Sequence, residues 1–265
     1  MKIAFLSDLH LDFVPKNGIE KLAKSLVDGD YDIALITGDI ATASSIFLVL
    51  PLIAEIFKNP IYFVKGNHDF WNSSIKQANS CAMEFSLREN QTCKWIQGAG
   101  PVVLSENTIL CGNDGFYDGR CGSFFSSNFL LNDSDRITEL KECRDREQLY
   151  ILLNKLGDDC AIYIRELVPK VKNYKNIIFM MHAPPFAEVS LFNNGPSPYY
   201  SLPFFACKAA GEALLDLKEI YSEKKIICLA GHSHTAATLH IDNLHVYVAE
   251  ATYGDPKIFS SFVID

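Results

Sequence analysis

The chain has 265 residues and a formal net charge of −8, with 48% hydrophobic and 21% charged residues. This composition is typical of a globular protein with a core of its own. The acidic charge argues against an extended nucleic-acid contact, because affinity for such backbones comes from neutralising phosphates. It permits a small phosphorylated substrate that is held by a locally positive site.

Neither export nor membrane insertion is predicted. The first residues, MKIAFLSDLH, form too short an apolar run for a signal peptide and lack a small-residue cleavage site. The most apolar stretch, residues 46–54, contains Pro51 and falls far short of the roughly 20 residues that span a bilayer. We therefore expect a soluble, cytoplasmic protein without membrane contact, whose eight cysteines are reduced thiols.

The first third of the chain alternates between strands and helices. The predicted strands are continuous apolar runs, rich in β-branched residues, that end sharply as buried strands do. The segments between them carry apolar residues at helical spacing, and Pro51 predicts a kink or a late start in the second helix. The strands are predicted at residues 3–7, 33–36 and 61–64, and the helices at residues 19–27, 43–57 and 72–88. This alternation indicates a layered α/β fold.

The rest of the chain is less regular. Two long loops, residues 112–133 and 184–203, interrupt it, and the second is too long for a passive connection, which favours a lid or a binding loop. We expect a hairpin over residues 102–104 and 108–111, helices over 137–156 and 159–171, buried strands over 177–181 and 226–230, and closing strands at Leu239 and over 245–249. With no repeat and no linker, residues 1–265 are predicted to form a single domain.

Each of the five buried runs is followed by residues that can bind a metal ion or transfer a proton. Five of the seven histidines lie at these ends. In open α/β sheets, sites form beyond the carboxyl ends of the strands, where the connecting loops meet. The residues are Asp8 and His10, Asp39, Asn67 with His68 and Asp69, His182, and His232 with His234.

The chemistry of these residues predicts a metal site. Carboxylate, imidazole and amide oxygen suit Zn, Mn or Fe, and the lack of thiolates argues against a closed structural zinc site. Glycines precede Asp39, Asn67 and His232, which predicts sharp turns there. The i, i+2 spacing of Asp8 and His10 predicts two side chains on the same side of an extended backbone. There are seven candidate ligands: Asp8, His10, Asp39, Asn67, His182, His232 and His234. Seven are too many for one ion and suit two ions that share a bridging carboxylate.

Taken together, the five blocks resemble those of a known family. Asp8-x-His10, Gly38-Asp39, Gly66-Asn67-His68-Asp69, His182 and Gly231-His232-x-His234 occur in order and resemble the calcineurin-like metallophosphoesterase superfamily. The resemblance implies an α/β fold, a four-layer α/β/β/α sandwich with two mixed sheets, and a centre of two divalent metal ions. It implies that one ion is held by Asp8, His10 and His234 and the other by Asn67, His182 and His232, with Asp39 bridging the two.

The resemblance also implies that His68 is catalytic and not a ligand, and that it assists the departure of the leaving group. Asp69 either orients the His68 ring or caps the following helix. In the loop over residues 112–133 and just beyond it, Arg120 or Arg136 either contacts the substrate phosphate or is a solvated charge. Tyr117 is a further candidate for the substrate pocket.

The expected function is hydrolysis of a small phosphomonoester or phosphodiester by attack of a metal-bridging hydroxide. The choice between the two ester classes stays open. One alternative is a nuclease of the same superfamily, which the acidic charge and the lack of a basic stripe disfavour. Another is a catalytically inactive scaffold with this fold, which the complete set of candidate ligands disfavours.

Overall fold

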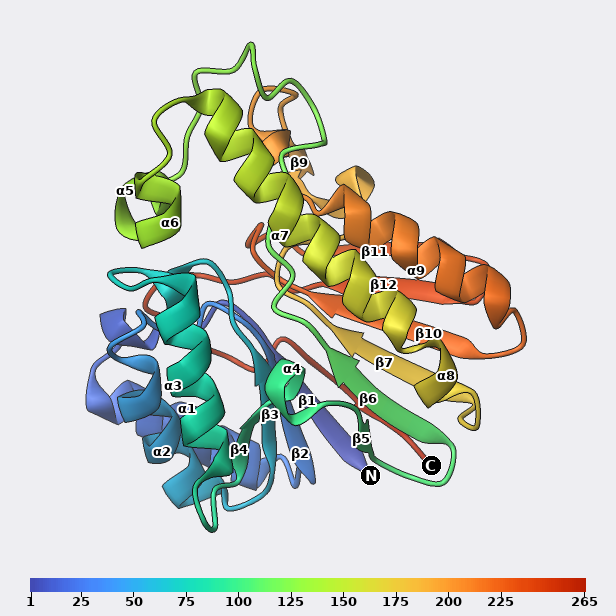
Figure 1. Ribbon diagram of the computed structural model, residues 1–265. Helices are drawn as coiled ribbons and strands as arrows, with labels where there is room; N and C mark the ends of the chain where they lie inside the picture. The colour runs from blue at the N-terminus through green and yellow to red at the C-terminus, as the bar shows by residue number, and fades with distance from the viewer.

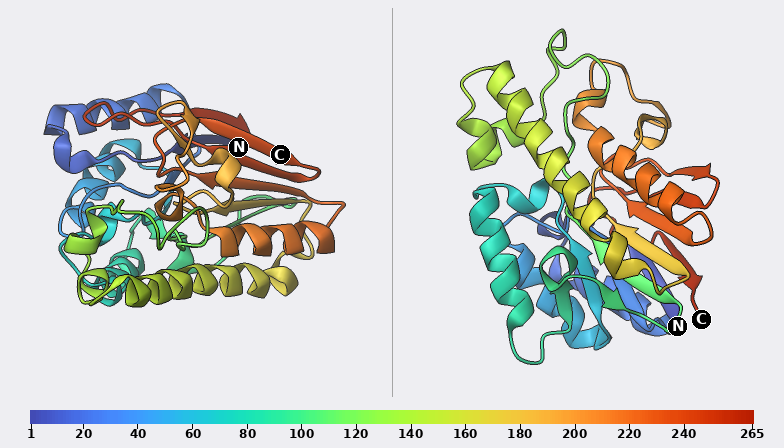
Figure 2. Two further views of the ribbon diagram at one scale, coloured as in Figure 1. Left: turned by 90° about the horizontal axis from the view of Figure 1, so that it is seen from above. Right: turned by 45° about the vertical axis from the view of Figure 1, so that its right-hand side comes forward.

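The computed structural model describes all 265 residues and contains two mixed β-sheets that lie face to face (Figure 1). Helices cover the outer face of each sheet, which gives the predicted α/β/β/α order of layers (Figure 2). None of the helices combines the length and the apolar character needed to cross a bilayer.

The first sheet is built from the N-terminal strands and one C-terminal strand. Its order is β13-β1-β2-β3-β4, in which β1 to β4 are parallel and β13 is antiparallel to β1. The strands are β1 (Lys2–Leu6), β2 (Ile33–Thr37), β3 (Ile61–Val64), β4 (Cys93–Trp95) and β13 (Ser260–Val263). The three strands predicted in this sheet are confirmed. β4 and β13 lie outside the prediction, because β4 has three residues and β13 begins with two serines.

The second sheet has the order β11-β12-β10-β7-β6-β5. Its four central strands are parallel, and β11 and β5 pair antiparallel at the edges. The strands are β5 (Val102–Val103), β6 (Thr108–Gly112), β7 (Asn176–Met180), β10 (Lys225–Ala230), β11 (Ala237–Ile241) and β12 (Leu244–Val248). The predicted hairpin, buried strands and closing strands are confirmed. A separate hairpin of β8 (Leu191–Phe192) and β9 (Gly195–Pro196) lies within the loop over residues 184–203.

Five long helices form the outer layers, and shorter ones lie in the connections. On the first sheet lie α1 (Lys16–Asp28), α2 (Ile46–Phe57) and α3 (Ile75–Leu87), and on the second lie α7 (Arg146–Glu166) and α9 (Lys208–Ile220). The short helices are α4 (Ile96–Ala99), α5 (Asp133–Arg136), α6 (Thr138–Lys141), α8 (Val168–Val171) and the 3₁₀ turns η1 (Leu11–Phe13), η2 (His68–Phe70), η3 (Ala187–Val189) and η4 (Leu202–Phe204). The second helix starts late, at Ile46, with Pro51 inside it.

Alternation along β1 shows why the strands are apolar on both faces. Ala4 and Leu6 pack into the core beneath α1 and α2, whereas Ile3 and Phe5 point into the core between the two sheets. A strand that is buried on both faces reads as a continuous apolar run, which is why these strands were readable in the sequence.

The break predicted between helices at residues 156–159 is wrong, because α7 runs unbroken from Arg146 to Glu166. Its start is fixed by Asp145, whose side chain accepts a hydrogen bond from the Gln148 backbone N–H. Gly157, which lies within the predicted break, is placed where a Cβ atom would come within 2.5 Å of the Asp118 Cβ. The glycine therefore permits a close contact with the preceding loop and does not end the helix.

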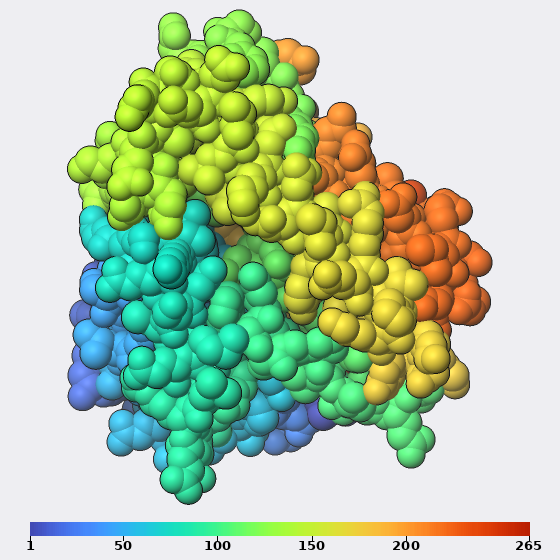
Figure 3. All heavy atoms as spheres, viewed as in Figure 1, coloured from blue at the N-terminus to red at the C-terminus, as the bar shows by residue number.

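Segments beyond the sheets cover the end of the sandwich. A separate core unites residues of η2, α3, α6, α7, η4 and the loop over residues 112–133. The Ile75 backbone N–H at the start of α3 donates to the Glu139 carboxylate of α6 at 2.9 Å, and the space-filling view shows α6 seated on that end of α3 (Figure 3). This cover lies over the carboxyl ends of β1, β2, β3, β7 and β10.

Candidate metal centre

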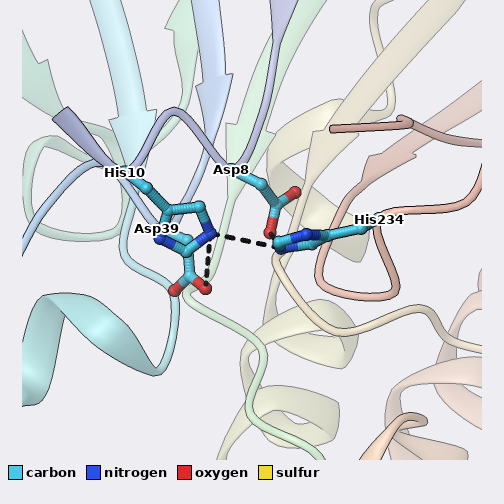
Figure 4. Close-up of side chains that lie close together, drawn as sticks. All are labelled: Asp8, His10, Asp39 and His234. Atoms are coloured by element: carbon cyan, nitrogen blue, oxygen red, sulfur yellow. Dashed lines mark hydrogen bonds and ion pairs between the residues drawn. The ribbon is translucent and has the colours of Figure 1, made fainter. Parts of the chain in front are cut away.

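Two groups of side chains meet at this end of the sandwich and share one carboxylate. Asp8, His10, Asp39 and His234 form the first group (Figure 4). Asp39, His182 and His232 form the second, and within each group the potential ligand atoms lie within 4.8 Å of one another. The first sheet supplies Asp8, His10 and Asp39 from the ends of β1 and β2, and the second sheet supplies the other three from the ends of β7 and β10.

The backbone at these residues is left-handed, so the expectation of an extended backbone at the paired residues is wrong. The φ angles are 50° at Asp8, 42° at His10, 50° at Asp39, 70° at His232 and 54° at His234. Non-glycine residues rarely adopt such angles, and they persist where the surroundings hold them. The chain therefore turns sharply after β1, β2 and β10, whereas His182 after β7 has no left-handed backbone.

Glycines let these turns approach one another. Of Gly38, Gly66 and Gly231, which precede Asp39, Asn67 and His232, only Gly38 has a positive φ, of 93°. At Gly66 a Cβ atom would lie 2.1 Å from Asp39 Oδ1, and at Gly231 it would lie 2.3 Å from Asp8 Oδ2. The sharp turn predicted from glycine thus holds at one position, and at the other two the missing side chain makes room for the carboxylates.

In the first group, ring nitrogens and carboxylate oxygens face one another. His10 Nε2 lies 3.1 Å from His234 Nε2 and 3.8 Å from Asp39 Oδ2. His234 Nε2 lies 3.3 Å from Asp8 Oδ1, and both Asp8 oxygens accept the His232 backbone N–H at 3.0 Å. These facing atoms are all capable of donating an electron pair to a cation.

In the second group, hydrogen bonds on the outside turn electron pairs inward. His182 Nδ1 lies 2.7 Å from the Thr37 carbonyl, and His232 Nε2 lies 2.8 Å from the Phe204 carbonyl. A carbonyl only accepts, so both of these nitrogens carry hydrogen. The inner nitrogens, His182 Nε2 and His232 Nδ1, are then 3.2 Å apart, and His182 Nε2 is also 3.3 Å from Asp39 Oδ1.

Asn67 completes this second group through a residue that sequence reasoning missed. Its Oδ1 lies 3.0 Å from His182 Nε2, while its Nδ2 donates to the Asp133 carboxylate at 3.0 and 3.1 Å. Asp133 is fully buried and also accepts from Trp71 Nε1 and from the Tyr117 hydroxyl. The NDSDRI stretch that contains Asp133 carries no signal of this role, because the contact joins residues 66 positions apart.

The electrostatics of the cluster favour positive charge at its centre. Burial opposes ionisation of Asp8, yet its hydrogen bond with His234 lowers the pKa to about 2. Burial likewise disfavours a charged His182, but Asp39 raises its pKa to about 10, so the inner Nε2 beside Asp39 attracts positive charge, either a proton or a cation in its place. Burial lowers the pKa of His232 to about 4, which keeps that ring neutral. Two carboxylates among inward-facing nitrogen and oxygen donors fit divalent cations of the Zn, Mn or Fe type.

His68 lies beside the cluster and belongs to neither group. Its ring stacks on Trp71 with centroids 3.5 Å apart, and its Nε2 lies 3.8 Å from Asp39 Oδ2. Its backbone N–H donates to Asp39 Oδ1 at 2.9 Å. Burial lowers the pKa of the His68 imidazole to about 4.

Asp69 takes neither of the roles considered for it. Its carboxylate accepts the backbone N–H groups of Ile40, Ala41 and Gly66 at 3.0, 2.9 and 2.8 Å, so its oxygens face away from the His68 ring. The cap of α3 is Ser74, which accepts from the Gln77 N–H. Asp69 instead ties together the turns that carry Asp39 and Asn67.

The three residues considered for substrate binding lie outside the cleft described below. Tyr117 is 1% exposed, and its hydroxyl donates a hydrogen bond to the Asp133 carboxylate at 2.8 Å. Arg120 is paired with Asp118 and Asp158 at 3.4 and 2.8 Å. The Arg136 guanidinium lies over the Trp71 ring, 4.7 Å from its centroid.

A cleft of about 440 Å³ opens over the cluster. Its floor contains Asp39, Asn67, His68, His232 and His234, and its walls include Leu131, Phe192, Asn193, Asn194, Phe205 and Tyr253. A larger cavity, of about 730 Å³, lies between the sheets beside β13 and contains none of the grouped residues, so the smaller cleft is the one relevant to the chemistry. Tyr253, whose ring centroid lies 4.2 Å from that of His10, was not predicted, since it follows no strand.

Solved structures of similar fold include a hydrolase and a phosphatase. The phosphopantetheinyl hydrolase of Mycobacterium tuberculosis superposes with a TM-score of 0.69 at 16% identity, over 95% of this chain and 89% of that one. A dimetal phosphatase of Danio rerio gives 0.59 at 10% identity, over 98% and 88%, and a Thermus thermophilus protein gives 0.55 at 13%, over 94% and 88%. At these identities the likeness shows the fold alone.

Comparison with curated protein sequences gives no match. A family model for calcineurin-like phosphoesterases does match, over residues 1–236, which include every grouped residue. The chain therefore belongs to the calcineurin-like phosphoesterase family and is a metal-dependent phosphoesterase.

Proposed function

We propose that the cluster holds two divalent cations and hydrolyses a small phosphate ester. In this proposal Asp39 bridges the ions, one of which is held by Asp8, His10 and His234 and the other by Asn67, His182 and His232. The observation that carries it is the second group, in which Thr37, Phe204 and Asp133 orient three side chains so that their electron pairs face the shared carboxylate. Such orientation by outer hydrogen bonds is characteristic of metal ligands.

Bound ions supply Lewis acidity, which acidifies water and neutralises charge on phosphoryl oxygens. The protein side chains supply the negative charge that holds the ions and a group for proton transfer. Asp39 and Asp8 hold negative charge at the centre, and the left-handed turns keep their carboxylates in place. His68 borders the cleft without joining either group, which supports a role in protonating the leaving oxygen of a bound ester.

The metals are expected to be Mn, Fe or Zn, the location is expected to be the cytoplasm, and residues 1–265 are expected to form one domain. One structural neighbour is a phosphopantetheinyl hydrolase, which supports a small phosphorylated substrate for this chain too. The cleft contains no Lys or Arg, which counts against the nuclease alternative, because nucleic-acid backbones are bound through such residues.

Metal analysis combined with two model substrates tests the proposal. The purified protein should contain close to two divalent ions per chain and should hydrolyse p-nitrophenyl phosphate or its bis ester when manganese is added. If both substrates are hydrolysed, the ratio of their kcat/KM values shows whether the enzyme prefers phosphomonoesters or phosphodiesters. Metal without activity on either would favour the inactive scaffold, and absence of metal binding would refute the dinuclear centre.

A further inference from the structure

The cleft over the metal centre has no cationic side chain. Its 14 lining residues include no Lys and no Arg, and the one carboxylate among them is Asp39, which belongs to the cluster. Lys and Arg are the side chains that pair with phosphate groups in proteins. A phosphate at the centre is therefore neutralised by the proposed ions alone, and a second phosphate on the same substrate finds no partner in the cleft walls.

Neutral hydrogen-bonding groups take the place where such cations would lie. Asn193 and Asn194 form the turn of the β8–β9 hairpin, with φ angles of 50° and 62°. Positive φ at both central residues is what a two-residue type I′ turn requires, and asparagine tolerates it well. Both residues line the cleft and are exposed, so their amides are open to hydroxyl or amide groups of a ligand.

The remaining walls are apolar or aromatic. Phe192, next to the hairpin turn, lies with its ring centroid 5.9 Å from that of Phe205, and Leu131 continues this wall. On the other side Tyr253 lies against His10 and is 52% exposed. Such surfaces favour an uncharged organic group, because burying a charge beside them without a partner is costly.

We infer that the substrate carries a single phosphate on an uncharged leaving group with hydroxyl or amide groups, and that Asn193 and Asn194 determine this specificity. The inference rests on the proposed function and narrows its substrate class. The cleft discriminates against a substrate with two phosphates because the second phosphate has no cationic partner there. A substrate with one phosphate avoids this unfavourable unpaired charge.

The test compares substrates that differ by one phosphate. We expect kcat/KM for fructose 6-phosphate to exceed that for fructose 1,6-bisphosphate by at least ~10-fold, which corresponds to about 1.4 kcal/mol. The same order should hold for AMP against adenosine 3′,5′-bisphosphate. Calorimetric binding to a slow His68→Ala protein gives a second readout, in which the bisphosphates should bind more weakly.

A positive charge added to the hairpin turn should reduce the preference for single phosphates. Asn193→Lys is expected to lower the KM for the bisphosphates about 5- to 10-fold, whereas Asn193→Gln, which keeps the amide, should not. Ser222→Lys adds the same charge at an exposed position outside the cleft and serves as the control for net charge. Discrimination that is unaffected by Asn193→Lys would overturn the assignment of the turn.

The outcomes separate this inference from the proposed function. Hydrolysis of p-nitrophenyl phosphate together with equal efficiency on single and double phosphates leaves the phosphoesterase in place and overturns the specificity. Failure to bind metal and to hydrolyse any ester overturns both.

Discussion

His68 is held in a position suited to proton transfer. Its ring is stacked on Trp71 and lies near Asp39 without belonging to either metal-binding group. We expect His68→Ala to lower kcat by roughly 10²- to 10⁴-fold, the usual contribution of general acid catalysis, and to leave the metal content unchanged. Turnover on p-nitrophenyl phosphate and elemental analysis of the same sample measure both effects.

The matched control is His240, an exposed histidine on the edge strand β11 whose ring pairs only with His245 and Tyr247. His240→Ala should keep full activity. If His68→Ala lost a metal ion in proportion to its activity, the residue would be a ligand and the catalytic role would be wrong.

Asp133 holds the side chain of Asn67, a proposed ligand of the second ion. Three donors, from Asn67, Trp71 and Tyr117, converge on its buried carboxylate. Asp133→Asn replaces an acceptor oxygen with an amino group that faces donors, so we expect a loss of about 1–3 kcal/mol in unfolding free energy and a lower content of the second ion. Denaturant unfolding and metal titration measure the two effects.

Tyr117→Phe is the control for Asp133, because it removes one of the three donors and leaves the Asn67 contact. It should cost about 0.5–1.5 kcal/mol and should bind two ions normally. Equal metal loss in the two variants would mean that Asp133 contributes only to folding and does not position Asn67.

At the scale of elements, α7 depends on the contact between Gly157 and the loop over residues 112–133. In an isolated helix, Gly→Ala stabilises by about 1 kcal/mol. Here the new Cβ would lie 2.5 Å from the Asp118 Cβ, and Asp118 also accepts the Ala209 N–H at the start of α9 at 2.8 Å. We therefore expect Gly157→Ala to lower the unfolding free energy despite the gain in helix propensity.

Thermal and denaturant unfolding check this expectation. Ile162→Ala, a change at an exposed position of the same helix, should stay within about 0.5 kcal/mol of the original protein. A higher unfolding free energy in Gly157→Ala would show that the loop adjusts to the new methyl group. The tight packing between α7 and the loop would then contribute nothing to stability.

At the scale of the whole molecule, the metal centre joins the two sheets. Asp8, His10 and Asp39 come from the first sheet, and His182, His232 and His234 come from the second. Ions that bind only the folded chain stabilise it, by about 2.7 kcal/mol at 100 times the dissociation constant. Removal with a chelator should therefore lower Tm by about 5–10 °C, on the usual scale for a chain of this size, and added manganese should restore it.

Asp39→Ala removes the carboxylate shared by the two groups and should abolish most of this chelator dependence. A Tm that is insensitive to both chelator and manganese in the unaltered protein would contradict a centre linking the sheets. Because Asp39 and Asp8 repel each other without a cation between them, the metal-free protein is expected to be folded but less stable.

Elements whose cause is local could be predicted from the amino-acid sequence. A run such as residues 61–64 is apolar throughout because both of its faces are covered, and its end is marked by Gly66 and Asn67. The chemistry of the site was likewise readable, because carboxylate, amide and imidazole side chains follow five such runs. Short or polar strands such as β4 and β13 were not readable, since their pairing with β3 and β1 and not their own pattern makes them strands.

The way in which these residues come together depends on the fold. Three features depend on contacts between segments far apart in the chain. They are the left-handed turns at Asp8 and His232, the hydrogen bond from Asn67 to Asp133, and the position of the β8–β9 turn over the cleft. Asp69 shows the same limit, because its neighbours in sequence suggested a cap or a partner for His68, whereas the fold gave it three backbone N–H groups. Residue type and local spacing fix which reactions are open to a side chain, but its partners are fixed by packing, which local sequence does not encode.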